Sequence, residues 1–529
     1  MSEMPIDEAS VAVKELPIAE RTQLLIIGAG PAGLAAAMAA SRRGIAAMLV
    51  DENPVPFETM GEDVPLHFGQ RMTGAARNRN AMMEEVLAAD PALTEAFEAG
   101  VDIRLGTVVW GLYAPMPTAG WIPGTIAALA DHERSWMVSA ENVVVAAGRR
   151  DMGLAFPGWE LPGVMGAVAA ARLATTYDAL AARRAVVLGT STETMLAVAA
   201  LRRAGVEIAA IVERADTVLD PAAVDALTGH VVARAEGDAE GVRAVVVTAV
   251  DADGRHVAGS ERRFDCDTVV LGVGTVPAIE LLEAMGARVA FDDARGGHVP
   301  VLDARQQTTR PGIYAIGDCA GIWPGKSRDA AVPRAEAEAA VAAIAASGDS
   351  HDAVLPDAPA ADLAAYRCGW VRASVVEAAG EPYVCQCEEV TARDILEVRP
   401  PRYLGWNPPT QKPADLRSLL GDGPPHPDQV KRLTRAGMGA CQGRRCREQV
   451  ATLLALGAAE PLAQVPLATF RAPVRPLPLS RLSPGTDAVT VGRGWDSWFG
   501  MAPQWVPFWK VPSHYTVSGR EPEGPVASE

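Results

Sequence analysis

Four of the seven cysteines fall in one stretch of the chain and have the spacing of metal ligands. They form two close pairs, Cys385 with Cys387 and, after a long gap, Cys441 with Cys446. Four thiolates suit either a zinc ion or an iron–sulfur cluster, and ligand number alone does not separate these alternatives. Paired cysteines of structural zinc sites are usually about two to four residues apart, so the single residue between Cys385 and Cys387 favours a 2Fe-2S cluster. Unligated thiols are the third alternative.

The residues around the second pair support a redox metal. Glycines flank Cys441, and their N–H groups can donate to cluster sulfurs, while Arg444 and Arg445 can offset the cluster charge. The other three cysteines are isolated, and we expect each to be a small buried hydrophobic residue: Cys266, Cys319 and Cys368.

A glycine-rich turn near the amino terminus predicts a dinucleotide site. The apolar run 23–27 should be a strand, and an alanine-rich helix and a second strand ending at Asp51 should follow it. Gly28 allows the tight turn, Gly30 lets the backbone approach a pyrophosphate, and Gly33 lets the helix pack closely on the strand. Asp51 stands where a carboxylate can bind a ribose hydroxyl.

Two later segments favour FAD over NAD as the ligand of this first unit. The apolar run 143–145 leads to Gly148, and the run 313–316 delivers Gly317 and Asp318 to its carboxyl end. Ligands of open α/β sheets bind at the carboxyl ends of strands, so these residues can reach the ribityl or pyrophosphate part of a flavin nucleotide. The alternative for Gly317 and Asp318 is an ordinary turn.

Residues 183–216 repeat the strand–helix–strand pattern, which indicates internal duplication. Only the first glycine, Gly189, is kept, because Ser191 and Thr194 stand at the second and third positions. Side chains there should crowd a pyrophosphate and the helix–strand contact. Glu213 ends the second strand and could still touch a ribose, but we expect a domain kept for packing and no NAD(P) binding.

Composition restricts the classes of function. The 529 residues should form two to four globular units, and the formal charge of −17 repels nucleic acid. Seven cysteines are few for this length and odd in number, which indicates reduced thiols. The sequence shows neither a signal peptide pattern nor a run of about 18 apolar residues. We therefore expect a cytoplasmic protein without a transmembrane segment.

With these motifs in place, residues 21–346 resemble the flavoproteins of the disulfide reductase-like superfamily. Three stretches resemble, more narrowly, the α subunits of heteromeric dye-linked amine dehydrogenases: TVVWGLY at 107–113, FPGWELPGVM at 156–165 and AIGDCAGI at 315–322. That group includes opine oxidases, hydroxyproline and proline dehydrogenases, and hydrogen cyanide synthase. Its members usually have a Gly-Gly-Gln turn soon after the acidic strand end, whereas here a longer segment precedes the candidate counterpart, Gly69 and Gln70.

The stretches VCQCEEVT and LTRAGMGACQGRRC resemble the bacterioferritin-associated-ferredoxin-like 2Fe-2S domain that is fused to these α subunits. The gap between the cysteine pairs is longer than in relatives, and we interpret residues 399–427 as a proline-rich insertion. The resemblance implies that an FAD-containing oxidase-like β subunit oxidises the amine, and that this chain passes electrons to a downstream acceptor. It also implies a further candidate partner, a small ferredoxin-like γ subunit, and two cofactor variants: FMN at a subunit interface, or ATP in place of FAD in this chain.

The resulting prediction is an electron-transferring flavoprotein and iron–sulfur α subunit of a dehydrogenase for a secondary amine or imino acid, of the opine, hydroxyproline, proline, sarcosine or glycine class. One alternative is a self-contained NAD(P)H-dependent ferredoxin or dye reductase, which needs a working second nucleotide site. The other is a non-catalytic scaffold and electron carrier. No catalytic base can be named in this chain.

The predicted fold is α/β, with two Rossmann-like domains, a small helical 2Fe-2S domain and a Trp-rich tail whose tryptophans at 495, 498, 505 and 509 should anchor a partner subunit. The predicted boundaries are an extension at 1–20, a discontinuous FAD domain at 21–155 and 296–350, a degenerate NAD-binding-like domain at 156–295, a cluster domain at 380–457, and an extension at 458–529. The predicted cofactor contacts are Gly28, Gly30, Pro31, Ala32, Gly33, Asp51, Glu52, Gln70, Gly148, Gly317 and Asp318, and the predicted metal ligands are Cys385, Cys387, Cys441 and Cys446.

Overall fold

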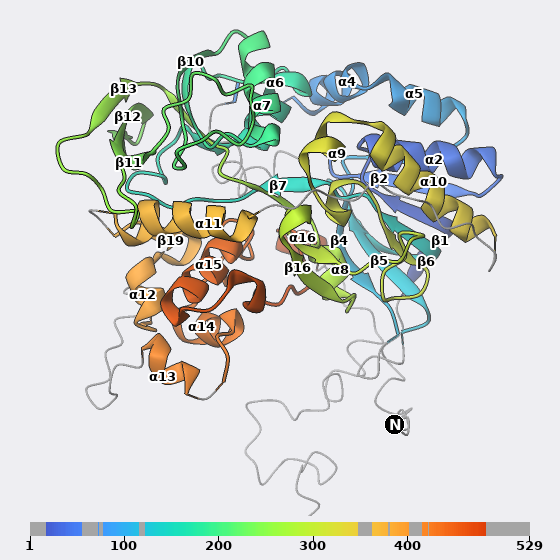
Figure 1. Cartoon of the computed structure of the whole chain (residues 1–529). Coiled ribbons are helices and arrows are strands. Elements are labelled where there is room, and N and C mark those ends of the chain that lie inside the picture. Colours follow the sequence, from blue (N-terminus) through green and yellow to red (C-terminus); the bar gives the residue numbers. More distant parts are fainter. Residues whose placement is uncertain are drawn as a thin grey trace, which may run out of the picture.

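The computed structural model describes residues 17–54, 72–73, 78–115, 122–346, 362–378, 381–400, 415–421 and 423–482. Two α/β units lie side by side, and a helical region near the carboxyl end packs beneath the second of them (Figure 1). In the described part of the chain, no helix combines the length and apolar character that crossing a membrane requires.

The first unit is a seven-stranded sheet in the order β3-β2-β1-β6-β5-β4, with β18 paired to β6. Strands β1, β2, β3, β6 and β18 are parallel, and β4 and β5 are antiparallel additions. Because β18 returns to the sheet long after β6, two separate parts of the chain build this unit. Its elements are β1 (Ile18–Ile27), α2 (Pro31–Arg42), β2 (Ala47–Asp51), α4 (Arg79–Ala89), α5 (Pro91–Glu98), β3 (Asp102–Leu105), β4 (Val108–Tyr113), β5 (Thr125–Ala130), β6 (Ser135–Val145), β18 (Ile313–Ala315) and α10 (Ala331–Ala345).

The second unit is a parallel sheet in the order β10-β9-β14-β8, accompanied by an antiparallel sheet of β11, β12 and β13. A short ladder between β7 (Arg149–Asp151) and β15 (Thr275–Pro277) lies between the two units, where the chain crosses from one to the other and back. The elements of the second unit are β8 (Val164–Gly166), α6 (Ala167–Thr175), β9 (Arg184–Leu188), α7 (Thr192–Arg203), β10 (Glu207–Val212), β11 (His230–Asp238), β12 (Gly241–Ala249), β13 (Arg262–Asp265) and β14 (Thr268–Leu271).

Shorter elements complete the connections and the helical region. After β15 come α8 (Glu280–Ala284), the antiparallel pair β16 (Val289–Asp292) and β17 (Gly297–Pro300), and α9 (Pro324–Arg328). The helical region contains α11 (Leu363–Val371), β19 (Tyr383–Cys385), β20 (Val390–Thr391), α12 (Ala392–Leu396), α13 (Leu416–Leu420), α14 (Pro427–Thr434) and α15 (Arg447–Ala458). The chain then returns to the first unit, where α16 (Leu479–Leu482) lies and Arg481 donates to the His132 carbonyl.

Local chemistry explains the ends of the helices that position the sites. Pro31 stands in the first turn of α2, where its missing N–H costs nothing, and Ser191 caps α7 by accepting a hydrogen bond from the Thr194 N–H. Thr391 and Asp394 form a capping box at the start of α12. The strands expected at 23–27 and before Asp51 are confirmed as the end of β1 and as β2.

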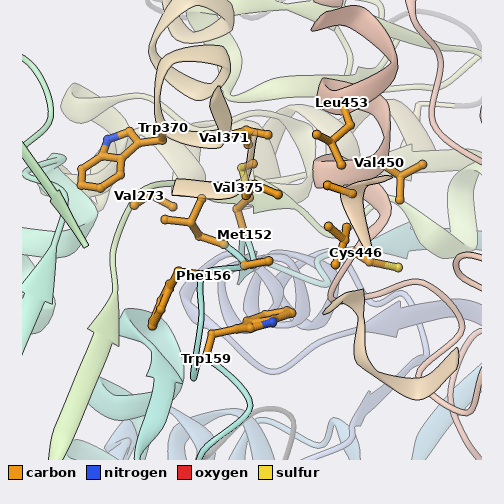
Figure 2. Packing of buried hydrophobic residues seen from close by; sticks show 14 of the residues in the cluster. Met152, Phe156, Trp159, Val273, Trp370, Val371, Val375, Cys446, Val450 and Leu453 are labelled. Carbon is orange, nitrogen blue, oxygen red and sulfur yellow. The ribbon is translucent and has the colours of Figure 1, made fainter. Parts of the chain in front are cut away.

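Among the described residues, the helical region shares its hydrophobic core with the second unit. One buried cluster joins Met152, Phe156 and Trp159 of the chain that crosses between units with Cys446 and Leu453 of the helical region, and it continues into the sheets of the second unit (Figure 2). The helical region and the second unit therefore bury their apolar surface against each other.

Candidate functional site

The glycine turn of the first unit is shaped by close backbone contacts. Gly28 has φ +108°, and a Cβ at this position would lie 2.2 Å from the Ala146 carbonyl oxygen. A Cβ at Gly33 would lie 1.8 Å from the Gly28 oxygen, so both positions require glycine. A Cβ at Gly30 would meet no atom within 4 Å, which means that this missing side chain leaves free space in front of α2.

That space belongs to a pocket of about 240 Å³ at the carboxyl ends of β1 and β2. The pocket also reaches β4, the end of β6, and the start of α6 in the second unit. Five of the predicted cofactor contacts line it: Gly28, Gly30, Asp51, Glu52 and Gly148. Pro31, Ala32 and Gly33 directly follow Gly30 at the start of α2. A Cβ at Gly317 would lie 2.8 Å from the Ala32 Cβ, and Asp318 forms an ion pair with Arg149 of the pocket lining. Gln70 lies outside the described residues, as do Gly69 and the tryptophans of the tail.

The two acidic residues at the end of β2 have different partners. Asp51 accepts hydrogen bonds from the Ala29 N–H at 2.6 Å and from the Asn53 N–H at 2.7 Å, so it holds the glycine turn. Glu52 forms an ion pair of 2.8 Å with Arg475, which also lines the pocket. Val474 fixes this late segment, because its N–H donates to the Trp110 carbonyl at 2.8 Å. Sequence reasoning missed Arg475, and no local pattern marks it.

One end of the pocket, which we call its far end, carries three arginines and a carboxyl group. This end is defined by the residues Arg149, Arg150, Asp151 and Arg172. Burial raises the pKa of Asp151 to about 6, although the N–H groups of Val168 and Ala169 donate to it. Cations at this end and the amino terminus of α2 near Gly30 suit a phosphate-containing ligand.

The Gly317–Asp318 turn is held by a buried ion pair. The carboxylate of Glu336 accepts from the Gly317 N–H at 2.7 Å, and the Lys326 ammonium donates to the Gly317 carbonyl at 2.6 Å. Lys326 and Glu336 also contact each other at 2.7 Å, which stabilises both charges inside the protein. Asp318 forms an ion pair of 3.5 Å with Arg149 of the pocket wall.

The corresponding place in the second unit is filled by the chain itself. Glu213 is fully buried and accepts hydrogen bonds from the Thr190 hydroxyl at 2.6 Å and from the Tyr366 hydroxyl at 3.0 Å. The Thr194 hydroxyl donates to the Gly272 carbonyl at 2.7 Å. The strand-end carboxylate that a ribose would need is thus already bound by side chains, one of which comes from α11.

The four predicted metal ligands come together as two pairs. Cys385 and Cys446 are close enough to share a proton, and so are Cys387 and Cys441. This sharing lowers the pKa of one thiol in each pair, Cys385 or Cys441, and raises the pKa of its partner, and the two pairs also affect each other. In the described part of the chain, no three Cys, His, Asp or Glu side chains converge as a ready-made site for one metal ion.

Glycines and cations surround these thiols. The Gly437 N–H donates to the Cys385 sulfur at 3.3 Å, and a Cβ at Gly439 would lie 2.2 Å from the Cys387 Cβ. Arg444 and Arg447 are buried beside Cys441 and Cys446, and the Arg445 guanidinium lies 5.0 Å from the centre of the Trp159 ring. Of the isolated cysteines, Cys266 and Cys319 are buried as expected, whereas Cys368 on α11 is partly exposed.

Comparison with known proteins identifies two parts of the chain. Residues 22–346 match the model of the pyridine nucleotide-disulphide oxidoreductases, and residues 412–486 match the sarcosine oxidase A3 domain. The second match covers Cys441, Cys446 and the segment that brings Arg475 to the pocket.

Whole-chain relatives carry the names of oxidase subunits. An opine oxidase subunit from Agrobacterium tumefaciens is 29% identical, with 91% of this chain and 94% of that protein covered. The alpha subunit of sarcosine oxidase from a Corynebacterium is 27% identical over 96% of this chain, which spans 51% of that longer protein. Among solved structures, L-proline dehydrogenase from P. horikoshii has a TM-score of 0.57 at 20% identity, covers 88% of this chain and 81% of its own, and supports the fold.

Proposed function

The chain belongs to the pyridine nucleotide-disulphide oxidoreductase family of FAD-dependent oxidoreductases, and from this premise we propose that it is the electron-transferring α subunit of a heteromeric amine dehydrogenase. The substrate is a secondary amine or imino acid of the opine, proline, hydroxyproline, sarcosine or glycine class. The observation that carries the proposal is the combination, in one chain, of an open nucleotide pocket in the first unit, a filled one in the second, and two pairs of neighbouring thiols.

The first unit is proposed to hold FAD. The free space at Gly30, the amino terminus of α2, and the arginines of the pocket wall fit the pyrophosphate of a dinucleotide. When bound, FAD supplies reversible two-electron chemistry. The approach of FAD would be shaped by the residues of the first turn, Gly28, Pro31, Ala32 and Gly33, and Asp51 holds this turn. The proposed route of the ribityl chain passes Gly148, Gly317 and Asp318. The cationic end of the pocket suits ATP equally, and FMN at a subunit interface is compatible with either nucleotide.

The cysteine site is proposed to hold a 2Fe-2S cluster. A single zinc ion needs its four thiolates around one centre, at about 2.3 Å each. Two separate thiol pairs, Cys385 with Cys446 and Cys387 with Cys441, instead match a centre with two metal ions that each take two thiolates. The buried arginines Arg444 and Arg447 would offset the negative charge of four ligating thiolates.

The residues of this chain then divide the work between them. The pocket binds and orients the nucleotide, and the shared core excludes water from the path between the pocket and the thiols. The chain crossing from Arg149 to Trp159 contacts both sites, and the indole N–H of Trp159 donates to the Tyr383 carbonyl at 2.7 Å, close to Cys385. A flavin exchanges two electrons, whereas a 2Fe-2S cluster exchanges one electron at a time. The proposed chain therefore delivers single electrons to an acceptor.

The oxidation of the amine is assigned to a partner chain. Opine oxidase and sarcosine oxidase relatives are named as subunits, and we infer that an FAD-containing oxidase-like β subunit assembles with this chain. A further candidate partner is a small ferredoxin-like γ subunit. The predicted intersubunit role of the Trp-rich tail concerns residues outside the described part of the chain. The cytoplasm is the proposed location.

The decisive experiment is native purification followed by measurement of nucleotide, iron, zinc and co-purifying chains. We expect one nucleotide and two irons per chain, a second type of chain in the complex, and flavin bleaching by an amine but not by NADH. One zinc per chain and no iron would refute the cluster. Rapid bleaching by NADH would instead favour a self-contained reductase, and no bleaching under any condition would favour a scaffold. Cys446→Ser should remove the iron and leave the nucleotide, while Cys319→Ser, the matched control, should leave both.

A further inference from the structure

Arg150 lines the nucleotide pocket and at the same time contacts the loop that carries the second cysteine pair. Its Nε donates to Glu280 at 2.8 Å, and its Nη2 donates to Glu448 at 2.7 Å. Its Nη1 donates to the carbonyl of Arg444 at 2.9 Å, between Cys441 and Cys446. One guanidinium thus joins the pocket wall, α8, α15 and the cysteine loop.

The residues that follow Arg150 extend this contact. The Ala155 N–H donates to the Gln449 side chain at 2.7 Å, and a Cβ at Gly153 would lie 2.3 Å from the Arg445 carbonyl oxygen. Met152 and Phe156 lie in the same buried cluster as Cys446 (Figure 2). The segment that leaves the pocket is therefore packed directly against the cysteine loop and the start of α15.

The charges of this junction are buried and balanced by Arg150. Its side chain is 10% exposed, and those of Glu280 and Glu448 are 10% and 6% exposed. Burial opposes ionisation of Glu280, but Arg150 and Arg475 outweigh it and lower its pKa to about 2. Because Arg150 is hydrogen-bonded to both carboxylates, it has a fixed position, and a charge placed next to it acts on both sides of the junction.

We propose that Arg150 is a positioning residue through which nucleotide binding in the pocket orders the cysteine loop and lowers the reduction potential of the centre bound there. The proposal rests on the function proposed above. A nucleotide adds negative charge beside Arg150, and a reduced centre carries one more negative charge than an oxidised one, so the two should disfavour each other. Linkage requires the reverse effect as well: reduction of the centre weakens nucleotide binding by the same factor.

The test uses the complete purified complex, stripped of nucleotide and then titrated with FAD, and with ATP in a parallel series. Amide hydrogen exchange of residues 441–455 reports the ordering of the loop, and EPR-monitored titration with dithionite reports the potential. We expect slower exchange on nucleotide binding and an about tenfold weaker affinity for the reduced protein, equivalent to a downward shift of about 59 mV for one electron.

Arg150→Lys keeps the charge but loses the forked contacts, and it should remove most of the exchange effect and at least half of the shift. Glu280→Gln, which keeps Arg150 in contact with Glu448, provides a second variant should the first fail to fold, and it should weaken both effects. Arg263→Lys is the matched control, because Arg263 pairs with Glu236 and Asp265 on the antiparallel sheet of the second unit, where none of the three lines the pocket, and it should change neither.

The outcomes separate this proposal from the one it rests on. Nucleotide and iron present, with exchange and potential unaffected by the nucleotide, would overturn the coupling and leave the proposed function intact. Equal coupling in wild type and Arg150→Lys would overturn the role of Arg150. A complex that binds neither FAD nor ATP would overturn the proposed function itself.

Discussion

The two nucleotide-type units of this chain have the same backbone turn but different side chains around it. The Gly28 N–H donates to the Val50 carbonyl at 2.8 Å, and the Gly189 N–H donates to the Val212 carbonyl at the same distance. Both glycines have positive φ, +108° and +93°, and a Cβ at either would collide with a carbonyl oxygen of the neighbouring strand. The first turn of the motif is therefore kept in both units.

The difference lies in the side chains around this shared turn. In the first unit the second glycine opens into a pocket, whereas in the second unit Ser191 caps α7 and Thr194 binds the Gly272 carbonyl. The strand-end acid follows the same division: Asp51 lines a pocket, and Glu213 is fully buried under Thr190 and Tyr366. In the second unit, hydrogen-bonding side chains thus occupy the place that is open in the first unit, while the backbone of the turn is the same.

The largest expected effect comes from filling the open pocket. Gly30 has φ −72°, which any residue adopts, so Gly30→Leu should fold and place its side chain where the nucleotide binds. We expect a loss of nucleotide affinity of about 100-fold or more, equivalent to about 2.7 kcal/mol. Equilibrium binding of FAD to the stripped protein measures it.

Ser191→Leu is the matched variant at the same position of the second unit. It should lose the helix cap, at a cost of about 1 kcal/mol in the free energy of unfolding, and leave nucleotide binding unchanged. Equal losses of affinity in the two variants would show that the units do not differ in the proposed way.

A smaller effect should follow from weakening the side chains that fill the second unit. Tyr366→Phe removes the hydroxyl that donates to Glu213 at 3.0 Å and leaves a buried carboxylate with fewer partners. We expect the free energy of unfolding to fall by about 1–3 kcal/mol, with nucleotide content unchanged. Denaturant unfolding measures the first quantity, and absorbance of the released nucleotide measures the second.

Tyr314→Phe is its control, since the Tyr314 hydroxyl accepts from the neutral Gln307 side chain at 3.1 Å, on the edge of the first unit. Its cost should be the smaller of the two. If Tyr366→Phe were neutral, hydrogen bonding to Glu213 would not be what closes the second site.

The smallest expected effect is a pH dependence at the far end of the open pocket. The folded-state pKa of Asp151, about 6, exceeds its ordinary value of 3.8, so between these values the folded protein holds a proton that the unfolded chain releases. The contribution of this proton to stability is complete below about pH 4 and is lost as the pH rises through about 6. A shift of this size corresponds to at most about 3 kcal/mol, and because Asp151 lines an open pocket where solvent screens its charge, we expect about 1–2 kcal/mol.

Asp151→Asn cannot titrate and should lack this component. We therefore expect the difference in Tm between the variant and the wild type to shift in favour of the variant as the pH rises from 4.5 to 7.5. Parallel pH profiles for the two proteins would exclude a raised pKa at Asp151.

The local parts of both units could be predicted from the sequence, because strand, turn and helix follow from residues within one short window. The apolar run before Gly28, the acidic end of β2 and the missing glycines at Ser191 and Thr194 are all of this kind. The pairing of the cysteines into 385 with 446 and 387 with 441 was not predictable, since it depends on how β19 and the second loop face each other.

The residues that sequence reasoning missed reach the sites from far along the chain. Tyr366 closes the second unit from α11, and Arg475 reaches Glu52 across most of the sequence. Such contacts depend on the packing of whole elements, which no periodicity or motif records. The contacts of Arg150 also depend on packing, because in the sequence this residue is only the second member of an Arg-Arg dipeptide.

The core that the second unit shares with the helical region has a consequence for the order in which the protein is made. Phe156 and Trp159 leave the ribosome long before Trp370, Val450 and Leu453, the residues that share their buried cluster in the finished protein. A nascent chain that ends before α11 would therefore expose these aromatic side chains to water, and it would be a natural client for chaperones. We therefore expect the second unit to complete its folding only after the helical region has been synthesised.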